Sequence, residues 1–411
     1  HENKFEPHFD LLPPESLRGI AKNLYSVFLD FPLSPALLQQ AEDRWDWGRI
    51  SCRSLPWSKA LIERYEDRWD WEQLSHNQTL PWSKELIEHV ENQWDWGRLS
   101  ENKALPWSES FIEHFESRWN WERLSGNEAL PWSKELVARY EDQWSWKEDG
   151  LGRNEGLPWS EMLIERYADR LDWGRWGLSR NRGLPWSEEL VARYEDRWDW
   201  KWLGQNQALP WSEALVARYE DRWDWSMLSC NEALPWSEAF IARYKAQWGY
   251  EGFTGLSTNR ALPWSETLIE RYADEWGRRL RRMSENEALP WSEPLIEHFE
   301  DRWIWRGWWG LSGNEGLPWS VTLLERFEDR WDWTPLSRNE ALPWSEELID
   351  RFEHQWDWEQ LSINSALPWS EKLIKRYYDR WDWGKFARNR AFLWSNATVQ
   401  RVIEESRGSR T

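Results

Sequence analysis

The chain has 411 residues, of which 72 are Asp or Glu and 52 are Lys or Arg, so its formal net charge is -20. This charge argues against a general binder of nucleic acids or anionic membranes, which are themselves negatively charged. The sequence has no run of the ~18–20 apolar residues that a membrane-spanning helix needs and no signal peptide. We therefore expect no membrane segment and a cytoplasmic location.

The first segment, residues 1–30, is predicted to cap the N-terminal end of the fold. Its apolar residues recur at helical spacing after the pair of prolines: Leu17, Ile20, Leu24 and Phe28. We expect one capping helix in this segment.

A repeat begins at residue 31 and dominates the rest of the chain. Leu-Pro-Trp-Ser occurs thirteen times, and degenerate copies end at Ser34 and Ser395. From Ser58 to Ser395, eight intervals are 25 residues, three are 27 and two are 28. A fixed period of this size with atypical end copies is typical of a solenoid. The repeats also hold most of the 43 tryptophans.

Each repeat is predicted to start with an amphipathic helix. Counting from the serine as zero, apolar residues fall at +3, +4, +7 and +11, which is one stripe of an α-helix. Ser is a favoured N-cap, and an acidic residue usually follows it, which suits the helix dipole. We expect this first helix to run for about eleven residues.

A second, shorter helix is predicted in the rest of each repeat. Position +12 is Asp, Asn or Ser in eleven of fourteen units, as in Trp69-Asp70-Trp71, and is read as its N-cap. Asn recurs in thirteen units at +19, or two or three residues later in the units with insertions, and we expect it to end this helix in a left-handed turn.

The fold class predicted from these features is all-α: an α-solenoid of about 14–15 helix-turn-helix repeats with capped ends. The alternative is a strand-lined horseshoe of leucine-rich repeats, which have a similar period. It is disfavoured because Trp71 and Leu74 are three residues apart, a helical spacing, and because Glu72 stands where a second Leu is needed. The predicted boundaries are 1–30 for the N-terminal cap, 31–390 for the solenoid, and 391–411 for a capping repeat and polar tail.

The repeat unit resembles the tryptophan-rich repeats of about 25 residues found in giant viruses and some bacteria. The shared pattern is Trp-Asp-Trp, then Leu-Ser-x-Asn, then Leu-Pro-Trp-Ser, and it covers roughly residues 31–395. The resemblance implies a repeat protein and implies no particular site.

No catalytic or metal-binding set stands out from the repeats. Three of the seven His occupy position +6, which is Arg in the other ten full units, and no His or Cys pair has zinc spacing. The +6 Arg is expected to pair with the acid three residues later, as Arg64 with Asp67, or to stack on a neighbouring Trp. Cys52 and Cys230 are read as free thiols. We expect no enzyme activity, cofactor or metal.

Insertions of two or three residues in five units are the features that differ most between repeats. They fall in the units beginning at Ser133, Ser160, Ser237, Ser265 and Ser292. Loops that vary on one edge of a solenoid often build its binding face. The candidate interaction residues there are Trp176, Phe253, Arg278, Arg279, Arg281, Arg282, Trp308 and Trp309. The alternative is that these are tolerated insertions at a turn.

These features favour a non-catalytic scaffold that binds another protein. One alternative is a structural protein that self-associates into filaments or a shell. Another is binding of single-stranded nucleic acid or glycans by rows of Trp and Arg, which the negative net charge and the packing role of most Trp disfavour.

Overall fold

The computed structural model describes residues 33–40, 42–147, 150–249, 255–276, 280, 282–386 and 388–392. Within these residues every regular element is helical and no β-strand occurs, so the protein is an α-solenoid, as predicted. The capping segment 1–30 lies outside the described residues, and so does the C-terminal segment from residue 393 onward.

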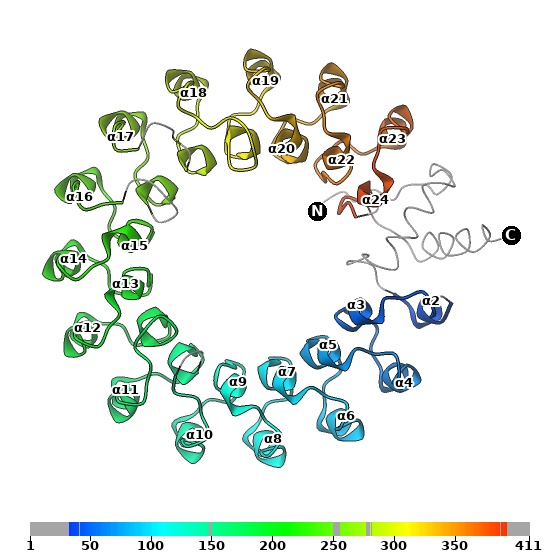
Figure 1. The fold of residues 1–411 in the computed structure, drawn as a ribbon, viewed down its shortest axis with the longest axis vertical. Helices are drawn as coiled ribbons and strands as arrows, with labels where there is room; N and C mark the ends of the chain where they lie inside the picture. Colours follow the sequence, from blue (N-terminus) through cyan, green and yellow to red (C-terminus); the bar gives the residue numbers. More distant parts are fainter. Residues whose placement is uncertain are drawn as a thin grey trace. The chain divides into compact units, whose positions relative to one another are not determined.

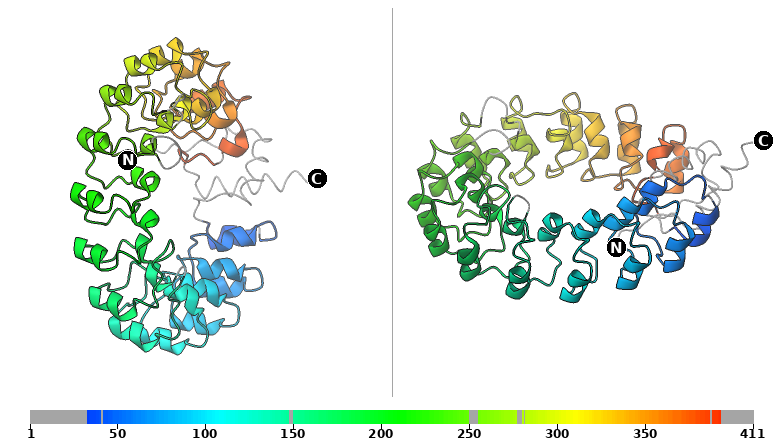
Figure 2. Two further views of the ribbon diagram at one scale, coloured as in Figure 1. Left: turned by 60° about the vertical axis from the view of Figure 1, so that its left-hand side comes forward. Right: turned by 60° about the horizontal axis from the view of Figure 1, so that its bottom comes forward.

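The chain divides into two compact units. The first unit is Trp47–Gly249 with Thr254–Leu262, and the second unit is His1–Asp46, Tyr250–Phe253 and Pro263–Thr411. In each unit the first and second helices of the repeats form two separate rows (Figure 1), which Figure 2 shows from two further directions.

The first unit carries a row of first helices and a row of second helices. Its first helices are α4 (Lys59–Arg64), α6 (Lys84–His89), α8 (Glu109–His114), α10 (Lys134–Arg139), α11 (Glu161–Tyr167), α12 (Glu188–Arg193), α14 (Glu213–Arg218) and α16 (Glu238–Arg243). Its second helices are α3 (Trp47–Ser51), α5 (Trp71–His76), α7 (Trp96–Glu101), α9 (Trp121–Ser125), η2 (Leu151–Arg153), η3 (Leu178–Arg180), α13 (Trp200–Leu203), α15 (Trp225–Ser229) and η4 (Leu256–Thr258). The second helices form the inner row of this unit (Figure 1).

The second unit repeats this arrangement. Its first helices are α2 (Pro35–Gln40), α17 (Glu266–Arg271), α18 (Glu293–His298), α19 (Val321–Arg326), α21 (Glu346–Arg351) and α23 (Glu371–Arg376). Its second helices are η5 (Met283–Glu285), η6 (Leu311–Gly313), α20 (Trp333–Arg338), α22 (Trp358–Leu361) and α24 (Trp383–Phe386). The five elements labelled η are short 3₁₀ helices, and they belong to the five repeats with insertions.

Each first helix begins as predicted but ends earlier. The Oγ of Ser58 accepts a hydrogen bond from the Leu61 N–H, 3.2 Å away, as an N-cap. The helix then ends at Arg64, after six residues rather than the expected eleven. The Trp69 indole N–H donates to the Ile62 carbonyl at 3.0 Å, so this carbonyl bonds the indole where a longer helix would use a backbone N–H. The apolar residues of the predicted stripe are nevertheless buried.

The repeated Asn and Ser join neighbouring repeats, which corrects the expected left-handed turn. Asn102 has an extended backbone. The buried side-chain amide of Asn127, at the same position of the next repeat, donates to the carbonyls of Ser100 and Asn102 in the preceding repeat, at 2.9 and 3.3 Å. The Ser100 Oγ donates to the Trp96 carbonyl and accepts the Asn120 N–H of the next repeat at 3.0 Å. Both residues are conformationally ordinary, and they recur because backbone groups at each repeat boundary need partners.

Most tryptophans form the framework between repeats, as the stripe pattern predicts. Trp96 packs against Phe115 and Trp119 of the next repeat, with ring centroids 5.2 and 5.1 Å apart. Its indole N–H donates to the Glu91 carbonyl at 3.2 Å, which satisfies its polar atom. The repeated rings therefore serve to pack neighbouring repeats together.

The Arg and His at position +6 also link repeats, unlike the predicted pairing within one repeat. Arg193 contacts Glu161 of the preceding repeat at 2.9 Å, and Arg139 contacts Glu109 at 3.1 Å. Where these Arg stack on a ring, it is the adjacent Tyr or Phe, as Arg218 does on Tyr219. No helix among the described residues has the length and apolar character required to span a bilayer.

Candidate functional site

Two predicted residues, Trp308 and Trp309, lie at the surface of the second unit. They precede η6 in an inserted loop, and their side chains are 47% and 65% exposed. Gly307, with φ at +85°, turns the chain before them, and its N–H donates to Asp332 Oδ2 at 2.9 Å. The Arg338 guanidinium lies 5.8 Å from the Trp308 ring centre. We call Trp308, Trp309 and Arg338 the tryptophan edge.

The predicted basic cluster is described only at Arg282. Its side chain is 14% exposed and contacts Glu285 at 3.0 Å, so its charge is matched within its own repeat. Phe253, Arg278, Arg279 and Arg281 lie outside the described residues. Their role stays a prediction.

Trp176 lies in the first unit and takes part in a stack that spans three repeats. Arg153 lies 5.5 Å from its ring centre and Arg175 lies 4.5 Å from it. Arg175 is also 4.8 Å from the ring centre of Trp202 in the next repeat. Arg180 lies 5.2 Å from Trp202. We call these five residues the arginine–tryptophan stack.

The local fold fixes the members of this stack. Arg180 lies in η3 and Trp202 in α13, whose N-cap is Asp199. Gly177 ends the inserted loop that carries Arg175 and Trp176, and a Cβ there would lie 2.0 Å from the Asp172 carbonyl oxygen. Only glycine fits this close approach, so it determines where the loop rejoins the repeat.

The stack borders a groove of about 1150 Å³ on the inner row of the first unit. Four carboxylates and six basic side chains line this groove. Of the two tryptophans in the stack, Trp202 is the one in the lining. The basic residues are Lys103, Arg123, Arg153, Arg175, Arg180 and Arg182. The groove is therefore locally positive in a chain with a net charge of -20. We call it the arginine groove.

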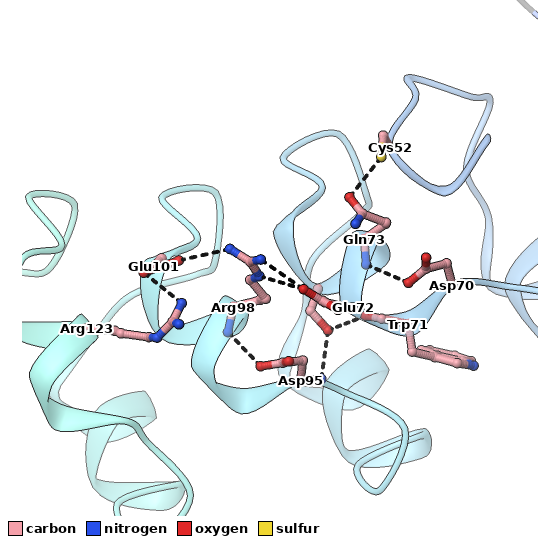
Figure 3. A network of polar contacts seen from close by, with 10 residues as sticks. Cys52, Asp70, Trp71, Glu72, Gln73, Asp95, Arg98, Glu101 and Arg123 are labelled. Carbon is pink, nitrogen blue, oxygen red and sulfur yellow. Dashed lines mark hydrogen bonds and ion pairs between the residues drawn. The ribbon is translucent and has the colours of Figure 1, made fainter. Parts of the chain in front are cut away.

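Carboxylates neutralise the bases at the N-terminal end of the arginine groove. Figure 3 shows Arg98 between Glu72 and Glu101, and Arg123 beside Glu101, with closest contacts of 2.8, 3.8 and 2.9 Å. Lys103 is likewise paired with Glu128 at 2.6 Å. Arg98 and Arg123 thus belong to one chain of ion pairs with Glu72 and Glu101, and Lys103 forms a separate pair between repeats.

The arginines farther along the groove differ from these paired bases. In the described part of the chain, Arg175 and Arg180 have no carboxylate partner, and both are exposed. Their guanidinium groups lie over tryptophan rings. A stacked guanidinium keeps its N–H fork available for a carboxylate or phosphate.

Other chemistry in the groove is limited. Burial raises the pKa of the Cys230 thiol, although the Gln205 amide opposes this effect, so the thiol stays protonated near neutral pH. Neither Cys52 nor Cys230 forms a disulfide in the described part of the chain. Among the described residues, no group of three or more His, Cys, Asp or Glu is arranged to hold a metal ion. The arrangement is suited to binding an anion.

Comparison of the chain with models of protein families, with curated proteins and with solved structures finds no match.

The sequence pattern identified Trp176 but missed its arginine partners and Trp202. The sequence does contain a pattern that could have identified the arginines. The residue directly before each repeated Asn lines the groove in six consecutive repeats. These residues are Glu101, Gly126, Arg153, Arg180, Gln205 and Cys230. This position varies while its neighbours repeat, and two consecutive arginines occur there. Variation inside an otherwise regular unit indicates a surface that packing does not determine.

Proposed function

We propose that the protein is a non-catalytic repeat scaffold that binds a protein partner. One observation carries this proposal: the repeated polar and aromatic groups already have bonding partners within and between repeats. Asn127, Ser100 and Trp96 each bond backbone groups of their own or a neighbouring repeat. Residues that differ between repeats are therefore the ones left to contact a ligand.

The tryptophan edge supports a protein as that ligand. Two adjacent exposed Trp rings form an apolar anchor of the kind enriched in protein interfaces. Arg338 adds a positive charge that has no carboxylate partner within the described residues. A partner surface that combines apolar and acidic groups complements this edge.

The proposal is tested by affinity capture from the cells in which the chain is native, followed by mass spectrometry. The Trp308→Ala/Trp309→Ala variant should lose specific partners that the unchanged chain recovers. Met162→Ala removes another exposed apolar side chain and should keep them. Equal recovery by both variants would contradict a role for the edge. Light scattering tests self-association. If the measured mass rises with concentration for the unchanged chain but not for the Trp308→Ala/Trp309→Ala variant, the edge mediates self-association instead.

A further inference from the structure

We infer that the arginine groove binds an extended acidic segment of a protein partner, with the stacked Arg175 and Arg180 gripping its carboxylates. This inference depends on the proposed function only in that the ligand is part of a protein. It concerns a different unit from the tryptophan edge.

The first argument is the geometry of the stack. The Arg175 guanidinium lies over the rings of both Trp176 and Trp202, at 4.5 and 4.8 Å from their centres. Each ring holds a guanidinium by cation–π attraction and thereby limits its freedom. A guanidinium held in this way loses less conformational entropy when it forms two parallel hydrogen bonds to a carboxylate. The stack is therefore preorganised for oxyanions.

The second argument is charge. In the described part of the chain, the guanidinium groups of Arg175, Arg180 and Arg182 have no carboxylate partner, whereas Arg123 and Lys103 at the other end of the groove are paired. An acidic ligand would supply the missing counter-charges. It would also be oriented, because only one end of the groove has arginines without carboxylate partners.

The third argument separates a peptide from a nucleic acid. Single-stranded nucleic acids bind through bases stacked on open aromatic faces. Here guanidinium groups lie over the rings of Trp176 and Trp202. Glu122 and Glu155 also line the groove and would repel a continuous phosphate backbone. A peptide can place carboxylates next to the arginines and uncharged residues next to these glutamates.

The size of the stack sets the length of the segment. Packed helical layers are about 10 Å apart, so a stack that crosses three repeats extends over roughly 20 Å. An extended chain rises about 3.3 Å per residue, so about six residues span it. A short acidic stretch is sufficient.

The test is fluorescence anisotropy of a labelled oligoglutamate peptide of about eight residues with the full chain at low salt. The unchanged chain should bind it, and Arg175→Gln/Arg180→Gln should weaken binding at least about tenfold. Arg222→Gln is the matched control, because Arg222 also stacks on a Trp but is paired with Asp196 at 2.9 Å. Its affinity should stay within about twofold.

Two further arms make the result specific. Arg175→Lys/Arg180→Lys keeps the charge and removes the fork, so it should bind as weakly as the Gln variant; unchanged affinity would overturn recognition by stacked guanidinium groups. Single-stranded oligothymidylate of equal charge should bind more weakly than the peptide. If the oligothymidylate binds more tightly than the peptide, and the Arg175→Gln/Arg180→Gln variant loses that binding, the groove binds nucleic acid and the inference is overturned.

The outcome is independent of the tryptophan edge. If oligoglutamate fails to bind while partner capture still depends on Trp308 and Trp309, the groove inference is wrong and the proposed function stands. If oligoglutamate binds through Arg175 and Arg180 but no protein is recovered, the groove is an anion site and the scaffold proposal fails.

Discussion

Asn206 donates its side-chain amide to the backbone carbonyl of Asn181, 3.0 Å away, which is the equivalent residue of the preceding repeat. The same amide reaches the Ser179 carbonyl at 3.2 Å, and the Asn206 Oδ1 accepts the Ala208 N–H. One buried side chain thus satisfies three backbone groups at a repeat boundary. The position therefore has a structural reason to repeat.

Replacing this residue should destabilise the protein strongly. Asn206→Ala leaves buried carbonyls and an N–H without partners, and we expect a loss of about 3 kcal/mol in the free energy of unfolding. The neighbouring exposed Gln207→Ala should change it by less than about 0.5 kcal/mol. Urea unfolding of both variants measures the difference. Equal effects would show that the Asn bonds do not hold the repeats together.

Gly177 should be intolerant of any side chain. In Gly177→Ala the new Cβ would meet the Asp172 carbonyl oxygen at 2.0 Å, so the inserted loop must shift and carry Trp176 with it. We expect a lower melting temperature and weaker oligoglutamate binding. Gly174→Ala lies in the same loop, and its Cβ would meet only the Asp172 carboxylate, at 3.2 Å. That control should behave like the unchanged chain.

Alkaline pH should destabilise the fold through its tyrosines. Burial raises the pKa of Tyr219 and Tyr244, and burial followed by a hydrogen bond to Asp350 raises the pKa of Tyr377. Unfolded tyrosines lose their protons near pH 10, before the folded ones do, so the unfolded state gains stability as pH rises above about 10. Stability should therefore be constant from about pH 8 to 9 and fall above it.

The tyrosine prediction has a natural control. Phe occupies the same repeat position at Phe115 and Phe327. Tyr219→Phe/Tyr244→Phe should make the loss of stability between about pH 9 and 11 less steep, measured by thermal unfolding. An unchanged slope would mean that these hydroxyls do not control the alkaline transition.

The exposed tryptophans should contribute little to stability. Trp308 and Trp309 are 47% and 65% exposed, whereas Trp303 is 4% exposed. Trp308→Ala/Trp309→Ala should leave the melting temperature nearly unchanged. Trp303→Ala should cost about 3–5 kcal/mol. Calorimetry of the two variants distinguishes surface rings from core rings, and unfolding of the double variant would contradict a binding role.

The sequence was sufficient for the fold where the cause is local. Ser58 and Asp95 cap their helices as expected, because an N-cap needs only its own side chain and the next turn. The length of the first helix and the role of Asn206 were mispredicted because both depend on distant partners. The indole that bonds the Ile62 carbonyl lies seven residues away, and the Asn bonds lie between repeats.

The candidate site was harder to predict for the same reason. Trp176 was identified from its insertion, but its contacts with Arg153 and Arg175 involve two repeats. Trp202 is brought in from a third repeat. Periodicity gives the spacing along the chain, and it does not give which side chains meet between layers.

Charge reversal in the arginine groove tests most directly the claim that residues differing between repeats select the ligand. In Arg175→Glu/Arg180→Glu the two arginines without carboxylate partners become carboxylates, while the Asn and Ser hydrogen bonds between repeats are kept. We predict that this variant melts like the unchanged chain, loses oligoglutamate binding and gains binding to an oligolysine peptide of the same length. A variant that folds normally and still binds oligoglutamate with unchanged affinity would contradict the claim.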